Sequence, residues 1–166
     1  RMSEGERKGN MAKWLKKMGE GAYGGTNVSS QLAALGDMAV DPLIEMANKQ
    51  GGKTVSESRI WAIVTLCNTR SKKAEDYILE RMFDPVGFGD LAFLVWHSQG
   101  FRSKRITDAL LKFCEDTASG KPMPWEKKHG AASRRHGMGA LEFAFKHLIA
   151  IKTSCTDDTA AGVLSM

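Results

Sequence analysis

The chain has 166 residues, a size common for a single domain, and 42% of them are apolar, which is enough to build a hydrophobic core. It contains no run of about eighteen apolar residues, so the sequence predicts no membrane-spanning helix. The three cysteines, Cys67, Cys114 and Cys155, are odd in number and far apart. Together with a polar N-terminus that shows no apolar signal segment, this spacing favours a reducing compartment and predicts a cytoplasmic location.

Residues 1–28 read as a flexible N-terminal segment that holds one short helix. Residues 1–10 mix glycine with charged residues and read as loose. The stretch 11–18 has helical periodicity, with Trp14 on its apolar side, and predicts a helix that covers the open end of the next unit. Residues 19–27 contain four glycines and predict a flexible connection.

Residues 29–117 contain a repeated pattern. Ala-x-Asp-x, two aliphatic residues and Glu occur at residues 39–45 and again at 74–80, an offset of 35 residues. A looser copy at 106–112 follows 32 residues later and keeps the Asp and the aliphatic pair. A period in this range is typical of stacked helical repeats.

Each copy reads as the second helix of a helical hairpin. Gly36, Asn68 and Gly100 stand where the first helix of each hairpin ends, and Gly or Asn suits the left-handed residue found there. Asp37 is suited to cap the helix that follows Gly36. One hairpin cannot bury its apolar face alone, so neighbouring hairpins are expected to stack. The residues expected in the core between hairpins are Ile63, Leu66, Leu79 and Leu110.

The segment 32–37, Leu-Ala-Ala-Leu-Gly-Asp, followed by Ala-Val-Asp-Pro-Leu-Ile at 39–44, resembles the HEAT-repeat family, especially its short bacterial versions. Pro42 lies about one turn into the second helix, as in that family, where early N–H groups have no intrahelical partner. The resemblance implies an α-α superhelix of about three to four stacked helical hairpins. Repeated helical periodicity and the shortage of alternating strand patterns predict an all-α fold of about seven to nine helices without a sheet. That family usually binds other macromolecules and has no common catalytic residues.

Three further segments complete what we expect to be one domain. Residues 118–130 read as a basic loop, because glycine and prolines oppose helix there. Residues 131–153 have apolar residues at helical spacing and predict a terminal helix. Residues 154–166 form a small, polar tail.

The basic loop is one candidate binding site. Trp125 precedes Lys127 and Lys128, and Arg134 and Arg135 extend the same stretch. A tryptophan beside lysines can stack on a base or a partner side chain while the cations contact phosphates or carboxylates. The alternative is that Trp125 folds back as an anchor that closes the last repeat, and we expect this second role.

A second candidate site is the face formed by the second helix of each hairpin. Its exposed candidates are Glu45, Lys49, Glu80 and Lys112. The leading hypothesis is therefore a non-enzymatic binding module, a scaffold for protein–protein interaction. The sequence leaves the oligomeric state open.

Two other hypotheses remain beside it. The first is nucleic-acid binding, because helical-repeat DNA glycosylases have this general architecture. Their catalytic Trp-Asp pair is not found, since no Trp in the chain is directly followed by Asp. The second is a helper that resembles the phycobilin lyase repeats, although no residue points to a bilin. His136 and His147 are eleven residues apart without an acidic or cysteine partner at ligand spacing, so no metal, cofactor or catalytic residue is predicted.

Overall fold

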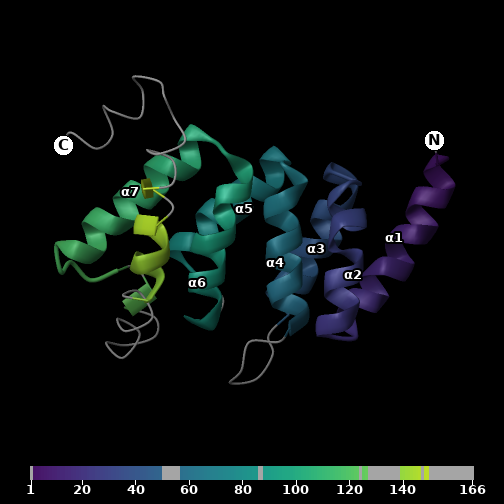
Figure 1. Cartoon of the computed structure of the whole chain (residues 1–166), viewed down its shortest axis with the longest axis horizontal. Coiled ribbons are helices and arrows are strands. Elements are labelled where there is room, and N and C mark those ends of the chain that lie inside the picture. The colour runs from purple at the N-terminus through teal and green to yellow at the C-terminus, as the bar shows by residue number, and fades with distance from the viewer. Residues whose placement is uncertain are drawn as a thin grey trace.

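The computed structural model describes residues 2–49, 57–85, 88–123, 125–126, 139–146 and 148–149. Over these residues it is helical and contains no strand, which confirms the predicted all-α class (Figure 1). The elements are α1 Glu4–Gly19, α2 Ala22–Ala33, α3 Asp37–Asn48, α4 Glu57–Thr69, α5 Lys72–Phe83, α6 Phe88–His97, the short 3-10 helix η1 Ser98–Phe101, and α7 Lys104–Ala118. Residues 139–146 and 148–149 are also helical.

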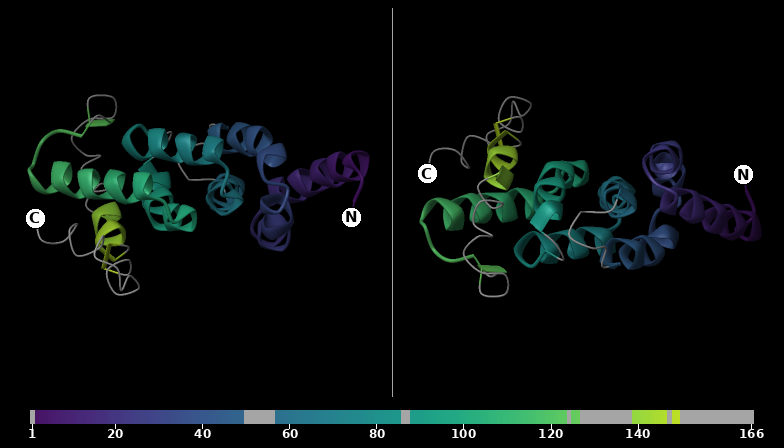
Figure 2. Two further views of the ribbon diagram at one scale, coloured as in Figure 1. Left: turned by 90° about the horizontal axis from the view of Figure 1, so that it is seen from above. Right: turned by 90° about the horizontal axis from the view of Figure 1, so that it is seen from below.

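The helices pack in two layers. In one layer α4 packs against α2 and α6, and in the other α5 packs against α3 and α7. Helix α1 covers α2 at the N-terminal end. The elements follow one another along the long axis of the molecule, with α1 at one end and α7 at the other (Figures 1 and 2).

Helix α1 starts earlier than the apolar periodicity predicted. It begins at Glu4 rather than at Met11, so the expectation of a loose stretch over residues 1–10 is wrong. Ser3 and Glu6 form a capping box, in which the Ser3 side chain accepts from the Glu6 N–H and the Glu6 carboxylate accepts from the Ser3 N–H. This pattern was visible in the sequence and stabilises the first turn without any apolar residue.

Helix α2 includes most of the glycine-rich stretch that we expected to be a connection. A β-carbon built on Gly25 would lie 2.2 Å from the indole ring of Trp61 in α4. Glycine there lets the two helices approach closely, so Gly25 marks helix packing rather than a loop.

The left-handed residues between helices are only partly the predicted ones. Gly36 has φ 57°, as expected, and it is the N-cap of α3, so that Asp37 is the first helical residue instead of the cap. Asn68 lies inside α4, and the left-handed position falls on Arg70 with φ 55°.

In the third turn, too, the left-handed residue comes two positions after the predicted one. Gly100 lies inside η1, and Arg102 is the left-handed residue, with φ 50°. A β-carbon on Gly100 would lie 2.7 Å from the carbonyl oxygen of Cys67, so this glycine is required by the close approach of two backbones.

The structure reveals a second repeated signal, which the sequence also contains. Residues 70–73 read Arg-Ser-Lys-Lys and residues 102–105 read Arg-Ser-Lys-Arg. In both copies the serine is the N-cap of the following helix, α5 or α7. The repeat therefore extends to the left-handed arginine and the serine N-cap.

The repeated positions also have equivalent roles in the core. The first aliphatic residue of each pair, Leu43, Ile78 and Leu110, is fully buried. The second is only partly buried, which corrects the prediction for Leu79. Ile63 and Leu66 of α4 are buried as predicted.

The N-terminal ends of α3, α5 and α7 are joined by polar contacts between repeats. Asp41 pairs with Lys73 at 2.5 Å, and the equivalent Asp76 pairs with Arg105 at 2.7 Å. Glu75 accepts a second bond from Arg105 at 2.9 Å. The N-cap serines add to this row, since Ser71 donates to Asp37 and Ser103 donates to Glu75.

Candidate functional site

The predicted binding face lies on α3, α5 and α7. Glu45, Glu80 and Lys112 occupy equivalent positions of the repeat on these three helices, and all three are exposed. Each has an ion-pair partner close by in the sequence: Lys49, the C-cap of α3, lies 4.0 Å from Glu45, Arg81 lies 3.1 Å from Glu80, and Asp116 lies 2.6 Å from Lys112. The structure therefore places the candidates on successive helices as a row of charges with both signs.

The basic loop is described only at its start. Trp125 is 0% exposed, and its ring stacks on Phe113 with centroids 5.8 Å apart. A fully buried ring cannot stack on a nucleotide base in this conformation, so Trp125 has the geometry of the expected anchor. Lys127, Lys128, Arg134 and Arg135 lie outside the described residues.

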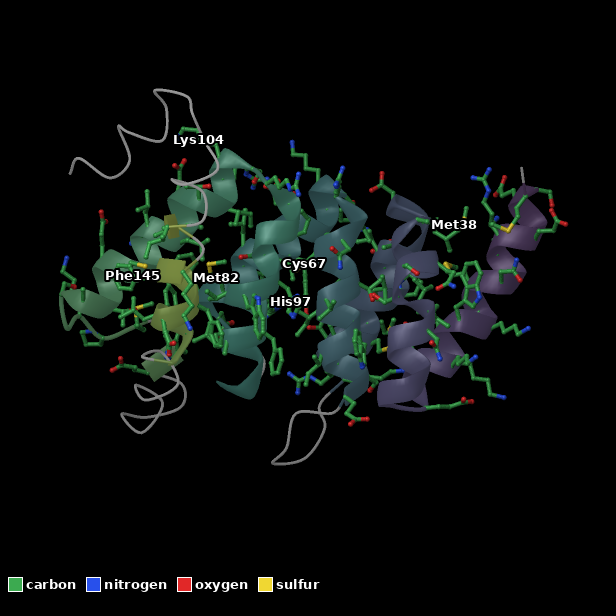
Figure 3. All side chains as sticks on the ribbon, viewed as in Figure 1. Met38, Cys67, Met82, His97, Lys104 and Phe145 are labelled. Carbon is green, nitrogen blue, oxygen red and sulfur yellow. The ribbon has the colours of Figure 1, made fainter. Side chains whose placement is uncertain are left out.

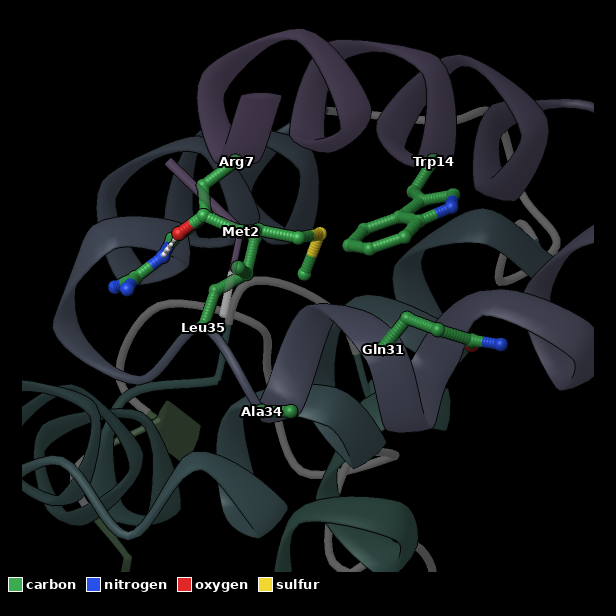
Figure 4. Close-up of a pocket in the computed structure, with 6 residues that line it drawn as sticks. All are labelled: Met2, Arg7, Trp14, Gln31, Ala34 and Leu35. Atoms are coloured by element: carbon green, nitrogen blue, oxygen red, sulfur yellow. Dashed lines mark hydrogen bonds between the residues drawn. The ribbon is translucent and has the colours of Figure 1, made fainter. Parts of the chain in front are cut away.

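A pocket that the sequence did not predict lies between α1 and α2 at the N-terminal end (Figure 4). Its volume is about 420 Å³, within the range of ligand-binding clefts. Three lining residues come from the first part of the chain and three from the end of α2 and the turn after it: Met2, Arg7, Trp14, Gln31, Ala34 and Leu35. The helical periodicity placed Trp14 on the apolar side of this helix, and the residue is partly buried.

Two polar contacts hold Met2 against α1. The Arg7 Nε–H donates to the Met2 carbonyl oxygen at 3.3 Å, and the Asn10 side-chain amide lies 3.4 Å from the Met2 sulfur. Met2 remains 45% exposed and lies between Arg7 and Trp14 (Figure 4). The walls are thus mostly apolar, and one guanidinium lies on the rim.

Helix α1 carries cations that have no acidic partner. Lys8 pairs with Glu4 at 2.8 Å, whereas Arg7, Lys13 and Lys17 make no ion pair within the described part of the chain. Glu6, the remaining acid of the first turn, is held by the capping box.

Aromatic rings of α6 stack on one another and on Phe143 of the helical residues 139–146. The ring centroid of Trp96 lies 5.5 Å from that of His97 and 5.0 Å from that of Phe143, and the rings are stacked. His97, which is labelled in Figure 3, also stacks on Phe93 with centroids 6.5 Å apart. Burial lowers the pKa of His97 below its usual value of 6.5. Trp96 remains 47% exposed despite these two contacts.

A second polar cluster surrounds Tyr77 of α5. The tyrosine hydroxyl donates to the Asn48 side-chain carbonyl at 3.0 Å, and the Arg81 guanidinium lies 5.6 Å from the ring centre. Burial raises the pKa of Tyr77, and burial lowers the pKa of the nearby Arg59. The hydrogen bond of Tyr77 joins the middle of α5 to the end of α3.

Neither described cysteine has the features of a nucleophile. Burial raises the pKa of the Cys67 thiol well above its ordinary range and raises that of Cys114 to about 11. At neutral pH both remain protonated, and the thiolate is the reactive form. The residues that the structure describes hold no group of three side chains able to bind a metal ion.

No helix within the described ranges is both long and apolar enough to cross a membrane. No family model, curated protein or solved structure matches the chain. The HEAT-repeat resemblance therefore remains a prediction based on the residues themselves.

Proposed function

We propose that the chain is a non-enzymatic module that binds a protein partner, built as a short α-α solenoid of HEAT type. The observation that carries this proposal is the equivalence of α3, α5 and α7. The three helices share a buried aliphatic position, successive ones are joined by ion pairs, and each presents a charged side chain at the same exposed position, namely Glu45, Glu80 and Lys112. Repeats of this kind create extended binding surfaces.

The charges on this face favour a protein over a nucleic acid. Asp41, Asp76 and Asp108 are exposed along the same three helices, beside Glu45 and Glu80. Each of these three aspartates is paired with a cation, namely Lys73, Arg105 and Lys104, so the face carries charges of both signs. A protein surface can complement such a mixture, whereas a nucleic acid selects a mainly cationic surface. The alternative of nucleic-acid binding rests on the cations of the loop, where the buried Trp125 offers no ring for stacking.

Affinity capture from native lysate tests the proposal when it is combined with charge reversal. The face variant carries Glu45→Lys, Glu80→Lys and Lys112→Glu, all at exposed positions. Such surface substitutions usually change stability by less than about 0.5 kcal/mol, so the fold is expected to remain. A true partner is enriched by the wild-type protein and is lost with the face variant.

A control variant has the same change in net charge on other surfaces. It carries Glu20→Lys, Glu142→Lys and Lys16→Glu, which are also exposed. We expect it to capture the same partner as the wild-type protein. If every captured protein is retained equally by the face variant, or is lost equally by the control, the assignment of the binding face is wrong.

A further inference from the structure

We propose that the pocket between α1 and α2 is a second binding surface, which takes an acidic protein segment anchored by one apolar side chain. This site lies at the N-terminal end of the array and does not depend on the face proposed above.

The walls fit an apolar side chain. Trp14, Met2, Ala34 and Leu35 line most of the cavity of about 420 Å³. Met2 is 45% exposed, and methionine adapts its shape to different occupants because its side chain is unbranched and flexible. Entry of a leucine or aromatic side chain would remove apolar surface from water on both partners, and this is the main source of affinity in such pockets.

The charge around the pocket selects an acidic segment. Arg7 lies on the rim, and only its Nε–H is used, in the bond to the Met2 carbonyl. Lys17 is three residues after Trp14 and therefore on the same side of α1. Neither cation has an acidic partner within the described residues. A glutamate or aspartate beside the apolar anchor would supply the missing carboxylate.

A nucleic acid fits this pocket less well. Its phosphates could contact the same cations, but it offers no flexible aliphatic side chain for a cavity whose walls are formed by Met2, Ala34 and Leu35. Nucleic-acid binding is therefore an outcome that the experiment must separate from peptide binding.

The experiment measures fluorescence anisotropy of a labelled peptide of about 14 residues, with one leucine at its centre among glutamates. Two matched peptides replace either the leucine with serine or the glutamates with lysine. A labelled single-stranded DNA of similar charge serves as a polyanion without apolar side chains. We expect the full-length protein to bind the acidic leucine peptide at least about tenfold more tightly than each of the other three probes, a ratio equal to about 1.4 kcal/mol.

Two variants locate the binding site. Ala34→Trp fills the pocket from an exposed position at the end of α2, where the backbone accepts any L-residue because φ is −66°. It should weaken peptide binding about tenfold or more while the circular dichroism spectrum is unchanged. Arg7→Glu should weaken binding several-fold at low salt, and less at high salt, because the contribution is electrostatic.

Lys16→Glu is the matched control for Arg7→Glu. Lys16 lies two residues after Trp14, on the far side of α1, so the same charge change is made away from the pocket. The proposal is overturned if Ala34→Trp binds the peptide as tightly as wild type, if the control loses as much affinity as Arg7→Glu, or if the DNA binds as tightly as the peptide. The face variant with Glu80→Lys should bind the peptide normally, so each surface succeeds or fails independently.

Discussion

Gly25→Ala is expected to destabilise the protein even though alanine favours helices. In an ordinary helix this substitution stabilises by about 0.4–1 kcal/mol, because alanine restricts the unfolded chain. Here the new methyl group would lie 2.2 Å from Trp61 Cγ and Cδ1 and 2.8 Å from its Nε1. Since carbon atoms in contact prefer about 3.5–4.0 Å, the indole must move by more than 1 Å. Overpacking of this kind typically costs about 1–3 kcal/mol.

Gly9→Ala supplies the matched control. Gly9 lies inside α1, and a β-carbon built there meets nothing within 4 Å. The effect of helix propensity is shared by the two variants, so the difference between Gly25→Ala and Gly9→Ala isolates the clash with Trp61. We expect Gly9→Ala to raise Tm. The free energy of unfolding of Gly25→Ala should be about 1–3 kcal/mol lower than that of Gly9→Ala. At about 2–4 °C per kcal/mol, this difference lowers Tm by roughly 2–12 °C.

Thermal unfolding followed by far-UV circular dichroism measures both variants. In a Trp61→Leu background the clash is removed, and Gly25→Ala should then behave like Gly9→Ala. Equal changes in Tm for the two alanine variants of the otherwise wild-type protein would refute the packing of α2 on α4 at Gly25.

Three further predictions concern stability and reactivity. Ile78→Ala should cost about 2–5 kcal/mol in chemical denaturation because Ile78 is fully buried, and Leu79→Ala should cost clearly less because Leu79 is only partly buried. Burial lowers the folded-state pKa of His97 from 6.5, so the unfolded chain binds a proton first as pH falls, and the free energy of unfolding should decrease below about pH 6.5. Cys67 should resist alkylation in the native protein at neutral pH and react after denaturation, since its thiol is buried and protonated.

Each of these predictions has a control. Equal losses in Ile78→Ala and Leu79→Ala would show that the aliphatic pair is oriented differently. His97→Phe keeps an aromatic ring in the stack and should reduce the loss of Tm between about pH 7 and pH 5; an unchanged loss would assign the pH dependence to other groups. Mass spectrometry of the peptide containing Cys67 measures alkylation, and rapid native labelling would contradict its burial.

The sequence by itself determined the helical class and the existence of a repeat. Apolar residues at helical spacing predicted the second helix of each hairpin, because any helix that packs on a neighbour must bury one face. The Asp and aliphatic pair of residues 39–45, 74–80 and 106–112 located three of these helices. The serine N-cap at 103, whose side chain accepts from the Ile106 N–H, was equally readable because capping depends on local hydrogen bonding, and so was the capping box at the start of α1.

Only the tertiary structure decided how neighbouring helices approach each other. Glycine signals loops in a local pattern, but Gly25 and Gly100 lie where Trp61 and the Cys67 backbone leave no space for a β-carbon. Which residue of an aliphatic pair is buried also depends on the rotation of the helix against its neighbours, which a pair of adjacent apolar residues does not specify. The pocket beside Trp14 arises in the same way, from the packing of α1 against the end of α2, and no local pattern contains it.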